Sequence, residues 1–267
     1  MAPTANAFFG LKLLESLPVA WTFLLFAVRF SGMMVIIPGI GGSFSGMVVR
    51  YPAVLALAFA ATASGVQSTI PENPALLLVQ ASSEFIYGYA IGLVPMMMVA
   101  GAQMAGFLSG TSMGLGAGNL IDPSLGQPAP DVARILGDLF ILMFLIFGGH
   151  YAVIRAVAGS EGQLVPGSLA ITDLSLPFII QQTTQIFKAG ILISAPVVVA
   201  LLLTQFMMGL LTKAVPTINV FVVSFPITIG IGLVLTMLSL PEIVIFMRSE
   251  LAGLDANVLN FAAEFQP

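Results

Sequence analysis

Long stretches without a charged residue constrain this chain more than any other feature of its sequence. Glu84 and Asp122 enclose 37 consecutive uncharged residues, and Lys213 and Glu242 enclose 28. An α-helix needs about 20 apolar residues to cross the roughly 30 Å of hydrocarbon in a bilayer. Only 7% of the 267 residues are charged and 58% are apolar, whereas a soluble domain has about a quarter of its residues charged. The chain is therefore predicted to be surrounded mainly by lipid or by other protein.

Six apolar regions are expected, and none shows the alternation of a β-strand. They cover residues 17–40, 52–70, 76–108, 133–158, 179–211 and 218–247. In lipid each backbone amide must be satisfied within the structure, so runs of this length predict helices and an all-α fold of integral-membrane-type hairpins. Proline stands within or at the edge of nearly every region, which predicts kinks at Pro38, Pro52, Pro95, Pro196, Pro226 and Pro241.

Composition and motifs exclude several classes of function. The chain has no cysteine and a single histidine, so it has no cysteine nucleophile, thiolate metal site or multi-histidine metal site. Neither of the motifs HExxH and GxxxxGK is present. Eight scattered basic residues and a net charge of −4 make no patch that would neutralise phosphates. We expect no enzyme, no cofactor, no bound metal and no nucleic-acid partner.

Glycines at four-residue spacing form the sharpest local pattern. Gly88 and Gly92 predict a smooth strip where another helix backbone can approach closely. Five glycines within residues 106–118 would make a costly helix, since each loses about 1 kcal/mol against alanine. A flexible apolar loop that stops a pore and then moves aside is one interpretation, and an ordinary close-packed helix end is the other. The residues concerned are Gly110, Thr111, Ser112, Met113, Gly114, Leu115 and Gly116.

Ionisable residues near the apolar stretches also allow two interpretations. Glu84, Asp138 and His150 have the chemistry of an intramembrane proton relay. The structural alternative pairs Arg134 with Asp138, four residues apart on one helix face, and uses His150, beside two glycines, to cap or cross-link a helix. We favour the structural roles, because buried ionisable groups are often simply paired.

An ordered set of short motifs resembles a known family. These motifs are Asp122-Pro123-Ser124-Leu125-Gly126 after the Gly-rich segment, Phe147-Gly148-Gly149-His150, Ala195-Pro196, Pro216-Thr217-Ile218-Asn219-Val220-Phe221 and Phe225-Pro226. Their order and spacing resemble the FliR family of type III secretion export-gate subunits over residues 29–233.

The resemblance implies a structural subunit, present once, that completes a helical pore of P-type and Q-type subunits in the bacterial inner membrane. The partners implied are these subunits, other export-apparatus membrane proteins and exported unfolded polypeptides, at a flagellar basal body or an injectisome base. Residues 1–178 would resemble the P-type subunit and 179–267 the Q-type hairpin, with 106–122 as the plug of the closed pore. Within the motifs, Asp122 and Asn219 join Glu84, Arg134, Asp138 and His150 as expected structural polar residues.

Two other functions stay open on the sequence. A proton-coupled secondary transporter of a small solute would use Glu84, Asp138 and His150 for coupling. The other function is that of a membrane scaffold without a pore. The transporter would be active as a single purified chain, whereas the gate subunit would be found in a large hetero-oligomer.

Overall fold

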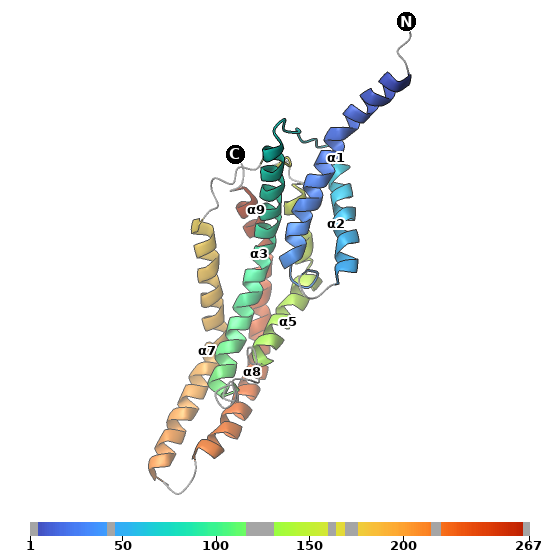
Figure 1. The fold of residues 1–267 in the computed structure, drawn as a ribbon. Coiled ribbons are helices and arrows are strands. Elements are labelled where there is room, and N and C mark those ends of the chain that lie inside the picture. The colour runs from blue at the N-terminus through green and yellow to red at the C-terminus, as the bar shows by residue number, and fades with distance from the viewer. Residues whose placement is uncertain are drawn as a thin grey trace. The chain divides into compact units, whose positions relative to one another are not determined.

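The computed structural model describes residues 5–41, 46–115, 131–159, 164–168, 176–214 and 220–263, and each regular element in these ranges is an α-helix (Figure 1). The all-α prediction is confirmed. The helices are α1 (Ala5–Ile36), α2 (Met47–Thr62), α3 (Pro74–Met113), α5 (Asp131–Ile146), α6 (Gly149–Ala158), α7 (Leu176–Ala214), α8 (Val220–Ala252) and α9 (Leu254–Ala263).

By length and composition, four of the described helices could each cross a membrane, and a fifth span is counted if α5 and α6 form one bent pair. The hydropathy of these helices makes the chain a membrane protein. The apolar region 52–70 supplies only the 16-residue helix α2, and the short helix α9 was not predicted.

The break between α5 and α6 falls at glycine and not at proline. Gly148 has a φ of 72°, in the left-handed region, and it precedes the first residue of α6. A side chain there would be strained, so the glycine permits the chain to leave one helical direction and begin another. By contrast, α3, α7 and α8 run through Pro95, Pro196 and both prolines of α8 without ending.

The chain divides into two compact units that interleave along the sequence. Unit 1 contains residues 1–96, 147–178 and 253–267, and unit 2 contains residues 97–146 and 179–252. Helix α3 therefore contributes its first part to unit 1 and its last part to unit 2. The predicted division at residue 178 separates a part that resembles the P-type subunit from a part that resembles the Q-type subunit. The compact units are defined by contacts within this chain, so they do not test that division.

In unit 1, glycines let α1 and the first part of α3 approach at the level of their backbones. A Cβ atom at Gly88 would overlap the carbonyl oxygen of Arg29, and one at Gly92 would lie 2.8 Å from the Cγ2 atom of Ile36. Gly32 of α1 meets the backbone of Phe85 in the same way. The predicted role of Gly88 and Gly92 is confirmed. Around this contact α1 also packs on α2, and α6 packs on α9.

Unit 2 is built on the hairpin of α7 and α8, which lie side by side in Figure 1. Its core joins Met113 of α3 and Val132 of α5 to Val197 and Leu201 of α7, with residues of α8 packed against them. Gly106 lies so close to α5 that a Cβ atom there would be 2.6 Å from the carbonyl oxygen of Val132. The last part of α3 thus contacts three other helices.

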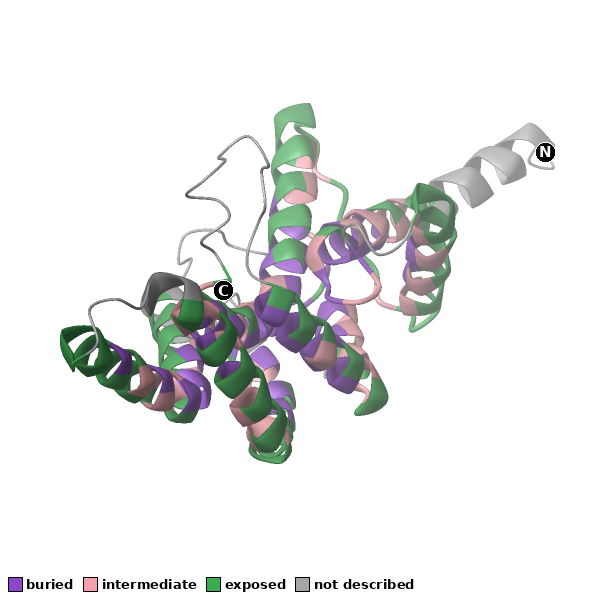
Figure 2. Ribbon diagram, turned by 90° about the horizontal axis from the view of Figure 1, so that it is seen from below, coloured by how far each residue is buried: buried purple, intermediate pink, exposed green. Residues whose placement is uncertain are grey.

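Much of the apolar surface of the described helices has no neighbour within the chain. Buried residues gather on the faces where helices meet, and the other faces are largely exposed (Figure 2). In the most apolar 18-residue window of α7, 28% of the residues are buried. In the corresponding window of the span that includes α8, the share is 11%. Side chains such as Leu203, Met237 and Leu238 are more than half exposed. Water cannot be the solvent of these faces, so lipid or partner subunits must cover them.

We expect Gly88→Ala to destabilise the protein, because the added methyl group must displace the backbone of α1. Overpacking of this kind costs about 1–3 kcal/mol. A matched control is Gly209→Ala in α7, where a Cβ atom would meet nothing within 4 Å. The control should be neutral or slightly stabilising, since alanine is the better helix former. Thermal unfolding of the detergent-solubilised protein measures both, and equal melting temperatures would contradict the close packing of α1 and α3.

Candidate functional site

The Gly-rich segment begins as helix and not as loop. Helix α3 runs through Gly106 and Gly110 to Met113, so the interpretation of 106–113 as a flexible loop was wrong. The alternative, a close-packed helix end, describes these residues. Their low helix propensity is offset by packing, because Gly106 lies against the backbone of α5 and Gly110 is buried. Gly116, Asp122 and Asn219 lie outside the described residues.

The end of α3 is a Schellman motif. The amide of Leu115 donates to the carbonyl of Gly110 at 3.1 Å, and the amide of Gly114 donates to the carbonyl of Thr111 at 3.0 Å. This pair of bonds requires a left-handed residue after the helix, and Gly114 has a φ of 89°. Gly114 is therefore the residue that stops the helix.

Met113, the last residue of α3, is fully buried in the core of unit 2. It packs with Val197 and Leu201 of α7, and Ile229 and Leu235 of α8 pack against this cluster. Gly232 of α8 makes the space, because a Cβ atom there would overlap the Met113 side chain. The helix end is held by the fit of this side chain.

Two side chains satisfy carbonyls of the last turn of α3. The last four carbonyls of a helix have no partner within the helix. The Nε2 group of Gln205 donates to the carbonyl of Ser112 at 3.0 Å, and the hydroxyl of Thr228 lies 3.1 Å from the carbonyl of Met113. The same hydroxyl is within 3.2 Å of carbonyls of its own helix, at Ser224 and Phe225. Neither Gln205 nor Thr228 was found by sequence reasoning, because only the fold brings them to this helix end.

A second polar site, in unit 1, is a fully buried ion pair. Arg29 of α1 donates from Nε to the carboxylate of Glu84 on α3, and both side chains have no exposed surface. Nη1 donates to the carbonyls of Val157 at 3.2 Å and Leu164 at 3.4 Å. The guanidinium also lies 4.9 Å from the centre of the Tyr87 ring, a favourable cation–π distance. This pair was not predicted, although the opposite charges of Arg29 and Glu84 within apolar stretches were a signal for it.

Glu84 also fixes the turn at residues 164–168. Its Oε1 atom accepts the amide of Gly167 at 2.6 Å, and Gln80 donates to the carbonyl of Gly167 at 3.1 Å. The amide of Ser168 donates to the carbonyl of Val165, and Gly167 has a φ of 87°. Proline at the second turn position and glycine at the third are typical of a type II turn. One carboxylate thus connects α1, α3 and this turn.

The other expected polar residues have structural surroundings. Arg134 and Asp138 approach to 4.0 Å at i,i+4 on α5, with side chains 83% and 59% exposed, as predicted. Asp131 begins α5. His150 lies in the first turn of α6, its ring 4.1 Å from the ring of Tyr151. Glu84 and Asp138 each have an arginine partner, which favours the structural interpretation over a proton relay.

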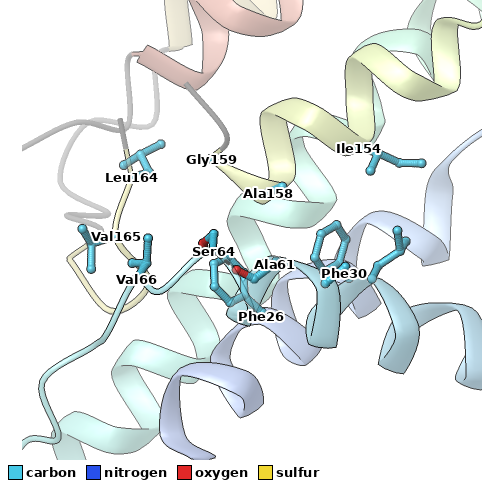
Figure 3. A pocket seen from close by; sticks show the side chains of 12 residues that line it. Phe26, Phe30, Ala61, Ser64, Val66, Ile154, Ala158, Gly159, Leu164 and Val165 are labelled. Atoms are coloured by element: carbon cyan, nitrogen blue, oxygen red, sulfur yellow. Dashed lines mark hydrogen bonds between the residues drawn. The ribbon is translucent and has the colours of Figure 1, made fainter. Parts of the chain in front are cut away.

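The described residues hold no group of three or more His, Cys, Asp or Glu side chains that could bind a metal. Unit 1 does contain a cavity of about 390 Å³. Figure 3 shows Phe26 and Phe30 of α1 on one side, Ala61 and Ser64 around the end of α2, and Ala158 of α6. Its lining is apolar apart from Ser64, so it offers no set of groups for catalysis.

Comparison with known proteins gives a consistent result. The family described as bacterial export proteins, family 1, matches residues 20–254. The chain is 33% identical to the flagellar biosynthetic protein FliR of Pectobacterium carotovorum over 187 residues, which cover 69% of this chain and 70% of that protein. It is 26% identical to FliR of Escherichia coli K12, covering 79% and 82%. It is also 25% identical to the Yop proteins translocation protein T of Yersinia pestis, covering 81% and 85%.

We expect Glu84→Gln to destabilise the protein strongly, because it leaves the Arg29 charge buried without a counter-charge. Breaking a buried pair in this way costs about 3–5 kcal/mol. Asp138→Asn is the control for an exposed pair and should cost at most about 1 kcal/mol. Unfolding of the full chain in detergent is the measurement.

The double variant Arg29→Met with Glu84→Gln tests the origin of the loss. It removes both charges but leaves the carbonyls of Val157 and Leu164 without their donor, so it should recover only part of the stability.

Equal stability losses for Glu84→Gln and Asp138→Asn would show that the buried pair has no special role.

Proposed function

Because this chain belongs to the FliR family of flagellar and type III secretion export proteins, we propose that it is a structural pore subunit of the export gate. In this role it passes unfolded polypeptides across the bacterial inner membrane without catalysing a reaction. The system is a flagellar basal body or an injectisome base, and the relatives include a flagellar biosynthetic protein and a Yop proteins translocation protein by name.

The observation that carries this proposal is the uncovered apolar surface of the α7–α8 hairpin. Only 11% of the most apolar window of the span that includes α8 is buried, and exposed leucine, valine and methionine side chains follow both helices. A subunit that is completed by neighbours needs such a surface, whereas a self-sufficient channel would bury more of it within one chain. Lipid would cover part of this surface and sister subunits the rest.

The proposed neighbours are the P-type and Q-type subunits of the gate, with other membrane proteins of the export apparatus around them. In this arrangement residues 1–178 take a P-type position and residues 179–267 a Q-type position. The hairpin of α7 and α8 is consistent with the second assignment. Unit 2 joins residues 97–146 of the first part to residues 179–252 of the second, so the two proposed parts pack together within one chain.

We further propose that the segment after α3 closes the resting pore. The residues from Gly110 to Gly116, within the longer range 106–122, are the proposed plug. The part up to Met113 is helical, so it would form the base of the plug, and the closing part would begin beyond it. An apolar, charge-free segment suits this role because it can seal against apolar walls.

A proton-coupled transporter is the weaker alternative. It requires Glu84 and Asp138 to exchange protons along a path, yet Glu84 is buried against Arg29 and Gly167, and Asp138 is paired with Arg134 on an exposed face. Glu84, Arg134, Asp138 and His150 are better explained as structural residues.

A first test is the native mass of the tagged chain after mild detergent extraction from a cell that has the whole export system. We expect a hetero-oligomer many times heavier than the 27.9 kDa chain. Co-purification of the P-type and Q-type subunits identifies the neighbours. A lone chain that transports a small solute by itself would favour the transporter instead.

A second test is a chain shortened by six residues, from 116 to 121, which leaves the buried end of α3 intact. We expect the complex to assemble and the resting membrane to leak ions and small solutes. Solute uptake into cells or vesicles measures this, with recovery of the complex by affinity purification as the control. Unchanged permeability of a fully assembled complex would contradict the plug.

A further inference from the structure

We propose that the last turn of α3, from Gly110 to Gly114, is a fixed base for the plug, held in place by three positioning residues on the α7–α8 hairpin. These residues are Gln205, Thr228 and Gly232. The inference rests on the proposed plug function and adds two points to it. The α7–α8 hairpin sets the position from which the plug starts. When the gate opens, the last turn of α3 stays in this position.

The first argument is the packing of Met113. Its side chain is fully buried, and it occupies the space that Gly232 leaves, where a Cβ atom would overlap Met113. Interiors are close-packed, so a side chain held on all sides resists displacement. To move this turn away, the protein would have to expose Met113 and leave a cavity between α7 and α8.

The second argument is the satisfaction of the carbonyls. Gln205 from α7 and Thr228 from α8 reach the carbonyls of Ser112 and Met113. The bond from Thr228 to the Met113 carbonyl is buried, and a buried carbonyl in an apolar membrane protein that loses its donor has no water to replace it. Both helices of the hairpin therefore contact the backbone of the same turn, Gln205 by a hydrogen bond and Thr228 by a hydroxyl that it shares with two carbonyls of α8.

The third argument is the geometry of Gly114. Its left-handed backbone ends the helix, and a Cβ atom there would lie 2.8 Å from the ring of Phe225 on α8. The chain thus leaves α3 in a direction fixed by the Schellman bonds and in contact with α8. By holding the last turn of α3, the positioning residues determine the direction in which the chain continues into the plug.

The first experiment compares resting leak in assembled export complexes that carry variants in α8. Gly232→Ala pushes against Met113 and should raise the leak, while the helix itself is favoured by alanine. Gly230→Ala is the matched control two residues away, where a Cβ atom would meet nothing within 4 Å. A leak from Gly232→Ala no larger than that from Gly230→Ala would overturn the proposal.

The hydroxyl of Thr228 is tested by Thr228→Val, which removes it, and Thr228→Ser, which keeps it. A hydrogen bond of this kind shifts an equilibrium by about 2- to 13-fold, so the valine variant should raise the leak severalfold and the serine variant should restore the low level. Valine keeps the shape of threonine, whereas serine lacks its methyl group, so a mere loss of packing would raise the leak in the serine variant and not in the valine variant. That result would count against a positioning role.

The second experiment asks whether the turn stays in place during export. The chain has no cysteine, so Met113→Cys with Gly232→Cys introduces a single pair. A Cβ atom at Gly232 would overlap the Cγ atom of Met113, so the two Cβ atoms would be at most about 4 Å apart, within the reach of a disulfide. We expect oxidation to form the bond and export to continue at the rate of the reduced variant. A bond that does not form, or one that stops export, would overturn the fixed base.

The two proposals fail in different ways. If shortening residues 116–121 causes no leak, the plug function is wrong. If the shortened chain leaks while Gly232→Ala and Thr228→Val do not, the plug stands and the positioning residues are wrong. The amount of assembled complex is measured for each variant. The disulfide test reports on the contact between Met113 and Gly232 even where no leak is found.

Discussion

The buried pair of Arg29 and Glu84 is the interaction on which the organisation of unit 1 depends. A charge within apolar helices is tolerated only when it is neutralised and hydrogen-bonded. Arg29 accordingly reaches Glu84 and two carbonyls beyond α1, and Glu84 receives the amide of Gly167. Because the partners come from α1, α3, α6 and the turn at 164–168, satisfying two charges also fixes the relative arrangement of these four segments.

Sequence reasoning predicted those features that depend on composition and spacing. The length of the uncharged stretches predicted the helical class, the spacing of Gly88 and Gly92 predicted close helix contact, and Arg134 and Asp138 were correctly paired at i,i+4. Each of these signals lies within one helix or one short segment. The family resemblance was also visible in the motifs, because their order along the chain carries the information.

Other features could not be predicted, because they depend on contacts between distant segments. Helix propensity suggested a loop at 106–113, but the backbone of α5 lies against Gly106 and favours the helix. The break between α5 and α6 falls at Gly148, where no proline stands, since the backbone there needs a left-handed residue. Gln205 and Thr228 gave no signal at all, for their partners are backbone carbonyls, which are the same in every sequence.

The Schellman end of α3 has a consequence for how the protein is made. Its two bonds connect residues within 110–115 only, so they can form before α7 and α8 are made, and the hairpin then fixes the position of this turn. During translation α3 can reach its final length long before the hairpin leaves the ribosome. The later helices can then pack around Met113 at a terminus whose hydrogen bonds are already formed.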